Sequence, residues 1–210
     1  MKKIMFNDRY GLTQAVLEGR KTQTRRVLST TMFFQRLKTY EGWSNDDIRA
    51  WKRSCNRQLY ETQGYMLQQM LDYALSSSCY KVGEVIAVAQ KYKDIALDMP
   101  VELAAELIKQ PGWKNKMFVK ADLMPHRIRI TNIRIERLQD ISDEDCIAEG
   151  IYPKANGRWY CYDVVRRMGV SYDPYPDPRE AYAALIDKIS GKGTWESNPW
   201  VFVYDFELVK

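Results

Sequence analysis

The stretch HRIRITNIRIERL, residues 126–138, contains the clearest strand pattern in the chain. Ile128 and Ile130 alternate with arginines, which predicts a half-buried strand. The next pair of isoleucines has slipped by one position in this alternation, so we expect a β-bulge or bend at residues 131 and 132. A long strand that bends in its middle is typical of small β-barrels.

Shorter strands are expected on both sides of this one. They fall at residues 3–6, 24–28 and 85–89 and at WVFVYDFELV, residues 200–209, and KNKMFVK, residues 114–120, is predicted as another. The helices predicted between them begin near Thr13, Pro100, Ser142 and Pro178. Closing such strands on themselves leaves fewer free strand edges than an open sheet does. The sequence therefore predicts an α+β fold, a small mixed β-barrel with surrounding helices.

Residues 29–80 differ in character from the rest of the chain. Ser44 stands three residues before Asp47, which is typical of a capping box, and apolar residues then recur at helical spacing. Methionine and aromatic side chains in such a pattern form packing surface more often than a ligand site. We therefore expect one domain, residues 1–210, with a helical insertion at about 29–80 that can offer a surface to a protein partner.

Composition argues against several classes of protein. The 210 residues are 45% hydrophobic and 28% charged, and the formal net charge of +5 permits an anionic partner without requiring one. No apolar run approaches the roughly 20 residues of a membrane helix, and MKKIMFNDRY lacks the apolar region of a signal peptide, so a cytoplasmic location is expected. The four cysteines form no CxxC pair and His126 is the single histidine, so neither a metal nor a cofactor is expected.

The stretch LEGRKTQTRRV, residues 17–27, crowds a lysine, two threonines and three arginines behind a glycine. A basic patch for phosphates, an activated threonine nucleophile and an ordinary solvated strand edge are all open interpretations. The glycine suits the left-handed position that ends a helix, and a turn there brings Lys21 and Thr24 to one side of the chain. If a strand begins at Thr24, then Thr24 and Arg26 share a face, and Arg25 points away to the surface.

A catalytic use of this stretch needs a proton acceptor. A threonine hydroxyl becomes a nucleophile when a neighbour takes its proton, and a lysine does so when burial or nearby cations lower its pKa. A carboxylate such as Glu149 can then pass the proton to a leaving amine. Glu149 ends a predicted helix, residues 142–149, where the helix dipole disfavours a negative charge, and this placement suggests a function. The spacing alone does not decide between this chemistry and a basic strand edge.

Two further groups of side chains are candidates for contact with a nucleic acid. Arg129 and the other arginines of the long strand project from the core, either as a solvated face or as phosphate contacts. Trp159, Tyr160 and Tyr162 lie in a tyrosine-rich loop, where an aromatic ring either stacks on a base or packs in the core.

The segment EGRKTQTRRV resembles the signature of the ASCH domain family, Gly-x-Lys-x-x-(Glu or Thr)-x-Arg, which Gly19, Lys21, Thr24 and Arg26 match. Later landmarks follow in the family's order. YKVGEVIAV is similar to its Gly-Asp-hydrophobic strand with glutamate for aspartate, RIRITNIRIERLQDISDEDCIAEGI to its long strand and helix, and SNPWVFVYDFE to the closing strand of longer bacterial and phage members. The resemblance covers most of the chain outside the insertion and a stretch near residues 152–180.

This resemblance implies a PUA-like β-barrel, related to RNA-binding domains, with a cleft lined by the signature. Small bacterial relatives are amidohydrolases that remove the acetyl group of N4-acetylcytidine, and they carry threonine in the signature. On that pattern Thr24 attacks the acetyl carbonyl, Lys21 activates it and Glu149 transfers protons. Arg26 then orients the substrate or stabilises developing charge.

We therefore expect a protein that binds RNA or a modified nucleoside in this cleft. Deacylation of N4-acetylcytidine-like nucleosides is one alternative, and a phage or accessory protein that binds a protein through residues 29–80 is another. The expected catalytic residues are Lys21, Thr24 and Glu149, and the expected ligand-binding residues are Gly19, Arg26, Arg129 and Trp159.

Overall fold

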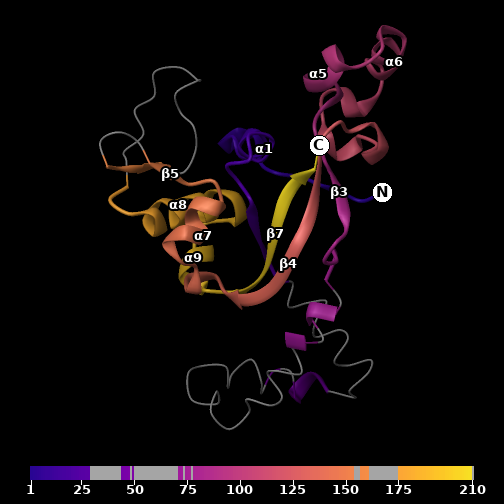
Figure 1. The fold of residues 1–210 in the computed structure, drawn as a ribbon. Coiled ribbons are helices and arrows are strands. Elements are labelled where there is room, and N and C mark those ends of the chain that lie inside the picture. The colour runs from indigo at the N-terminus through magenta and orange to yellow at the C-terminus, as the bar shows by residue number, and fades with distance from the viewer. Residues whose placement is uncertain are drawn as a thin grey trace.

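The fold is built on a five-stranded mixed sheet with the strand order β1-β3-β4-β7-β2 (Figure 1). The computed structural model describes residues 1–28, 44–47, 49, 71–72, 74–76, 78–153, 157–160 and 175–209. Most of the predicted helical insertion at 29–80 lies outside the described residues, but the predicted capping box is confirmed, because Asp47 N donates to Ser44 Oγ and Ser44 N donates to Asp47 Oδ2. Tyr162 lies outside the described residues as well.

Strands that pair in the sheet are far apart in the sequence. β1 runs parallel to β3, and the other neighbours in the sheet are antiparallel. A separate two-stranded sheet joins β5 and β6. The strands are β1 (Lys3–Ile4), β2 (Gln23–Val27), β3 (Val85–Val88), β4 (Arg127–Arg137), β5 (Tyr152–Pro153), β6 (Trp159–Tyr160) and β7 (Trp200–Val209).

Helices cover one side and one end of the main sheet. In Figure 1, α7, α8 and α9 gather on one side, whereas α5 and α6 project beyond one end. The helices are α1 (Leu12–Leu17), α5 (Tyr92–Ile95), α6 (Val101–Leu107), α7 (Asp143–Ala148), α8 (Pro178–Ser190) and α9 (Thr194–Ser197). Single 3-10 turns are η1 (Asp8–Tyr10), η2 (Ala96–Asp98), η3 (Pro111–Trp113), η4 (Lys116–Phe118), η5 (Ala121–Leu123) and η6 (Leu138–Asp140). Within the described part of the chain, no helix has the length and apolar character needed to span a bilayer.

The predicted irregularity in the long strand is confirmed. The register of β4 against β7 shifts between Ile130 and Asn132, so Thr131 is the extra residue. Ile128 and Ile130 are fully buried in the main core, whereas the arginines that alternate with them are exposed. The shift lets the strand bend while its isoleucines on both sides of the bulge stay on the same face of the sheet.

The predicted closed barrel is not confirmed, although the α+β class is. Among the described strands, β1 and β2 are the two edges of the sheet, and no ladder joins them. Instead, Arg26 Nη2 donates to the carbonyl of Met5, just beyond β1, at 2.7 Å. The strand β1 has two residues only, because the chain turns into η1 soon after it, and this leaves too little strand to pair with β2.

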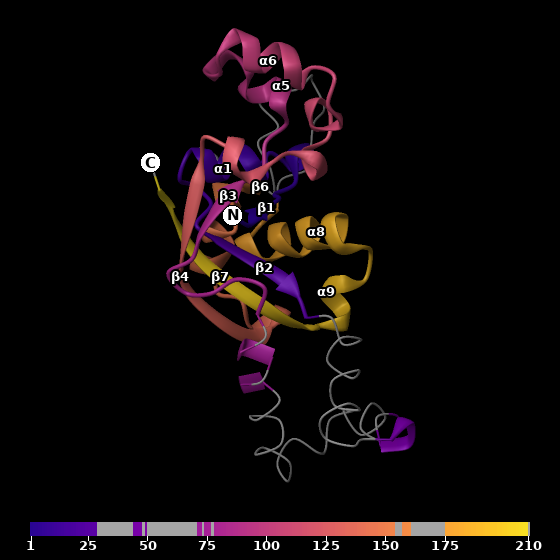
Figure 2. The same cartoon turned by 90° about the vertical axis from the view of Figure 1, so that its right-hand side faces the viewer.

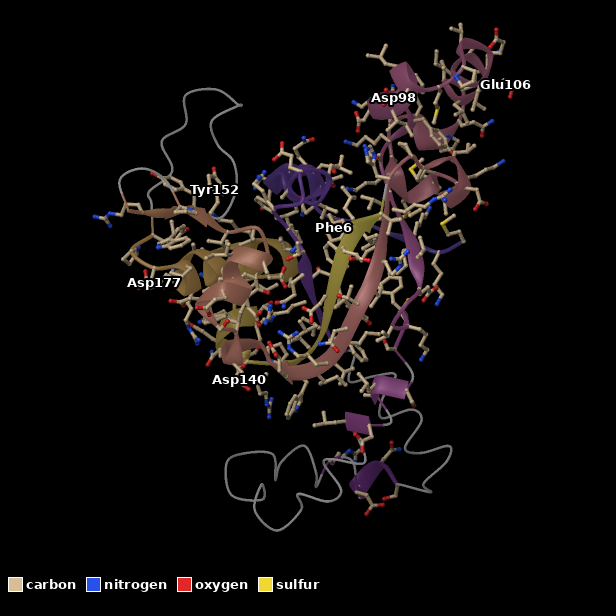
Figure 3. All side chains as sticks on the ribbon, in the orientation of Figure 1. Phe6, Asp98, Glu106, Asp140, Tyr152 and Asp177 are labelled. Atoms are coloured by element: carbon tan, nitrogen blue, oxygen red, sulfur yellow. The ribbon has the colours of Figure 1, made fainter. Side chains whose placement is uncertain are left out.

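The sheet nevertheless curls strongly enough to bring its two edges near each other. Phe6, which follows β1, lies beside β7 in Figure 3, with its ring centroid 5.7 Å from that of Phe206. Both rings belong to the main core cluster, which also receives side chains from α1, α7 and α8. The space between the two edges is where the candidate site lies.

A second, smaller core lies under α5 and the 3-10 turns that follow α6. The strand predicted at residues 114–120 is wrong, because this segment forms the turn η4. The Asn115 side chain accepts a hydrogen bond from Met117 N, and Lys3 Nζ donates to the carbonyls of Met117 and Val119. Local and side-chain partners thus replace a strand ladder here.

Candidate functional site

A cavity of about 760 Å³ lies between β2, the segment after β1 and the C-terminal half of α8. Residues 24–27 of β2 and residues 5–9 both line it. Figure 2 shows β2 at the front of the sheet with α8 and α9 beside it. Of the residues proposed from the sequence, the structure brings four to this cavity: Lys21, Thr24, Arg26 and Glu149.

The centre of the site is a buried ion pair between Lys21 and Glu149. Lys21 Nζ lies 2.5 Å from Glu149 Oε2, and it also donates to the carbonyls of Glu149, at 2.8 Å, and of Gln23, at 2.7 Å. The side chains of Lys21 and Glu149 are only 1% and 6% exposed. The three hydrogen-bond donors of the ammonium group therefore all have partners.

Local sequence positions both members of this pair. Gly19 adopts φ +72 after α1, as predicted for a residue that ends a helix, and the chain then turns into β2. Thr22 N donates to the carbonyl of Ala148 at 2.9 Å, which ties the turn to the end of α7. Gly150 follows Glu149 with φ +104, and a Cβ there would lie 3.7 Å from the Lys21 side chain. The two turns thus pack directly against each other.

The electrostatics of Lys21 are those of a coupled buried pair. Burial lowers the pKa of Lys21, and the negative charge and hydrogen bond of Glu149 oppose this shift. The contact of 2.5 Å between Nζ and Oε2 places the two side chains directly against each other at the cavity wall. Because burial lowers the pKa of Lys21, its ammonium group gives up a proton more readily than an exposed lysine does.

Thr24 lies within β2, opposite Tyr204 of β7, and is buried. Its side chain lines the cavity and makes no hydrogen bond to another residue that the structure describes. A threonine hydroxyl in this setting is available to a ligand, either as a donor or as an acceptor.

Arg25 is placed by the structure in the interior, so its predicted surface position is wrong. Its side chain is 0% exposed. Arg25 Nη2 lies 2.5 Å from Glu136 Oε1 and 2.7 Å from Asp145 Oδ2, and Nη1 lies 3.4 Å from Glu149 Oε1. The predicted alternation along β2 is still correct, because Arg25 and Gln23 share a face and contact each other. That face is covered by acidic residues of β4 and α7, which the local pattern of β2 does not reveal.

The ion pairs of Arg25 belong to a larger network of charged and polar side chains. Arg134 contacts Glu136, Asp145 and Asp205, and Gln23 donates to both aspartates. Burial alone would raise the pKa of Asp145, but hydrogen bonds from Gln23 and Arg25 and nearby positive charges lower it. The network holds α7, and hence Glu149 at its C-terminal end, against the sheet.

Three other predicted ligand-binding residues lie outside the cavity wall. Gly19 is exposed at its turn. Arg129 is an exposed residue of β4 whose guanidinium pairs with Glu207 at 2.8 Å. Trp159 packs partly buried against the main core and bonds through its backbone to Tyr175. Their assignment as ligand contacts stays a prediction.

Sequence reasoning did not identify the wall that α8 contributes. Tyr182, Leu185, Ile186 and Ile189 follow helical spacing and line the cavity. The helical spacing of these apolar residues is visible in the sequence, but the same spacing is found in helices that pack against an ordinary core. The Tyr182 hydroxyl is buried without a hydrogen-bond partner in the described part of the chain. Burial and the nearby Glu149 charge raise the pKa of Tyr182, so the phenol stays neutral.

Substituting Tyr182 with phenylalanine should stabilise the fold. A buried hydroxyl without a partner costs about 1–3 kcal/mol, and Tyr182→Phe removes it while keeping the ring. We expect a higher urea midpoint with an unchanged slope. Tyr92→Phe is the matched control, because Tyr92 Oη accepts from Lys120 N at 2.8 Å and its loss should lower the midpoint. A lower midpoint for Tyr182→Phe would contradict the absence of a partner.

Comparison of this chain with protein families, with curated proteins and with solved structures found no match.

Proposed function

We propose that this chain is an ASCH-type, PUA-like protein that binds a nucleoside or nucleotide, free or within RNA, in the cavity beside β2. One observation carries the proposal. Lys21, Thr24 and Arg26 of the signature line the same cavity as Glu149, and Lys21 bonds directly to Glu149 although 128 residues separate them in the chain. The packing of β2 in the sheet does not by itself require Glu149 to lie beside the signature residues.

The shape and chemistry of the cavity suit a ligand of this size. Its volume lies in the range of roughly 300–1,000 Å³ that small-molecule sites occupy. Leu185 and Ile186 provide an apolar wall, and Thr24 provides a hydroxyl. Arg9 and Arg26 are exposed at the cavity and form no ion pair with any carboxylate in the described part of the chain, so they can attract a phosphate.

The direct test offers the protein a panel of ribonucleosides, their 5′-phosphates and N4-acetylcytidine. Calorimetry measures the binding of each compound, and mass spectrometry detects any product. We expect saturable binding that Thr24→Val weakens by about tenfold, because the hydroxyl is lost while the side-chain volume is kept. Thr131→Val is the matched control, since Thr131 is an exposed threonine of β4 outside the cavity, and it should bind as the wild type does. Absence of binding to every nucleoside and to single-stranded RNA at low salt would refute the proposal.

Deacylation of N4-acylated cytidine is a second candidate function. It is favoured by the arrangement of the Thr24 hydroxyl in the same cavity as the Lys21–Glu149 pair. Thr24 Oγ1 would attack the acyl carbon while its proton passes to the pair, and the pair would then protonate the leaving N4 amine. Water would hydrolyse the acyl-threonine ester, releasing the acid and restoring the hydroxyl.

Mass spectrometry of N4-acetylcytidine incubated with the protein separates this function from binding alone. Catalysis requires cytidine and acetate to appear with the wild type and to be absent with Thr24→Val. Binding without product would leave the first proposal intact and exclude the second.

A further inference from the structure

The strand β2 has one edge that the sheet does not use. Thr22 O accepts from Phe206 N at 2.8 Å, and Leu28 N donates to Trp200 O at 2.9 Å. Because the backbone groups of an antiparallel strand point alternately to its two sides, those of Thr24 and Arg26 also face β7. The N–H and C=O groups of Gln23, Arg25 and Val27 therefore point away from β7, at the free edge of the sheet.

At this edge the described residues leave most backbone groups unpaired. The carbonyl of Gln23 accepts a hydrogen bond from Lys21 Nζ. Neither Arg25 nor Val27 forms a backbone hydrogen bond at the free edge with another residue that the structure describes. Both residues line the cavity, and Arg25 as a whole is only 5% exposed. Backbone groups in folded proteins almost always have a partner in the protein or in water, so the N–H and C=O of Arg25 are available to a ligand that enters this cavity.

We propose that the backbone N–H and C=O of Arg25 form two hydrogen bonds with the pairing edge of a nucleobase. On such an edge a donor adjoins an acceptor, which matches the two groups that one strand residue presents on one side. This assignment rests on the proposed function, because it concerns how a nucleoside is held in the same cavity. The fixed charge network around the Arg25 side chain keeps its backbone in place.

A base fits this edge better than an added peptide strand does. A strand needs a row of successive free groups, whereas here Lys21 already closes the edge at Gln23. The contact from Arg26 to the Met5 carbonyl spans the gap between the two edges and limits the length of a bound chain. Two hydrogen bonds from one residue are sufficient for a base.

The test compares each ribonucleoside with the form methylated on the ring nitrogen of its pairing edge: 3-methyluridine, 3-methylcytidine, 1-methyladenosine and 1-methylguanosine. We expect the methylated form of the bound nucleoside to bind at least about tenfold more weakly, because the hydrogen bonds are blocked. In parallel, amide hydrogen exchange followed by NMR should show that the unmodified nucleoside slows exchange at Arg25. The amides of Thr24 and Arg26 are internal controls, since they face β7 with or without ligand.

The outcomes separate this inference from the proposed function. If nucleosides bind but their methylated forms bind equally well, or if exchange at Arg25 is unchanged, the edge assignment is overturned and the binding function stands. If no nucleoside binds, the binding function itself fails and the edge assignment fails with it. If instead an extended peptide slows exchange at Arg25 and Val27 and nucleosides do not, the edge is a peptide site and the assignment is also overturned.

Discussion

Replacing Lys21 with methionine is expected to lower the free energy of unfolding by about 3–5 kcal/mol, the range found when one partner of a buried ion pair is removed. The side chain of Lys21 is 1% exposed and that of Glu149 is 6% exposed, so neither can be rehydrated without opening the fold. Methionine keeps the length of the side chain but leaves the carboxylate and the carbonyl of Gln23 without the ammonium group. Urea unfolding followed by circular dichroism measures the loss.

The double substitution Lys21→Met with Glu149→Gln is the control for this prediction. Because it removes both charges, it should recover part of the stability that the single substitution loses, so the two effects should not add. If the effects of Lys21→Met and Glu149→Gln were additive, the pair would not be coupled in solution. A loss below about 1 kcal/mol for Lys21→Met would indicate a solvated pair.

Arg25→Met should be similarly severe, with a loss of about 3–5 kcal/mol. The guanidinium of Arg25 contacts three carboxylates, those of Glu136, Asp145 and Glu149, and its side chain has no exposed surface. Its removal leaves their charges close together with Arg134 as the remaining arginine of the network. Unfolding in urea at neutral pH measures this loss.

Arg129→Met is the matched control for Arg25→Met. Arg129 also lies on a strand and also pairs with a glutamate, Glu207, but both side chains are about half exposed. We expect its substitution to change the free energy of unfolding by less than about 1 kcal/mol. Equal losses at the two arginines would show that burial of Arg25 has no energetic consequence.

The local elements of the fold were predictable because their signals lie within a few residues. The slipped alternation in residues 126–138 predicts the bulge of β4, and Gly19 predicts the end of α1. Ser142 predicts the start of α7, where its side chain accepts from Asp145 N. In each case the side chains and the backbone geometry that they determine are neighbours in the sequence.

The burial of Arg25 and the open edge of the sheet could not be predicted in this way. An arginine next to a strand threonine is normally exposed, and its burial depends on Glu136 and Asp145, which lie more than a hundred positions away. Barrel closure depends on whether β1 is long enough to reach β2, and a two-residue strand has no recognisable pattern. Residues from distant elements decide both features.

The candidate site falls between these two cases. Lys21, Thr24, Arg26 and Glu149 were proposed from a resemblance, and the structure brings them to one cavity, although their roles stay predictions. The wall formed by α8 had no functional signal, because an apolar helix face packs equally well on a core.

The pairing of β2 with β7 also has a consequence for the synthesis of the chain. Gln23 is aligned with Asp205, and Val27 with Val201, so the partner of β2 is translated long after β2 itself. Until β7 has left the ribosome, β2 has no neighbour in the sheet, and pairing over such a separation is slow. Lys21 and Thr24 therefore leave the ribosome well before the strand that supports them, and a nascent chain in which β7 is not yet translated lacks the assembled site.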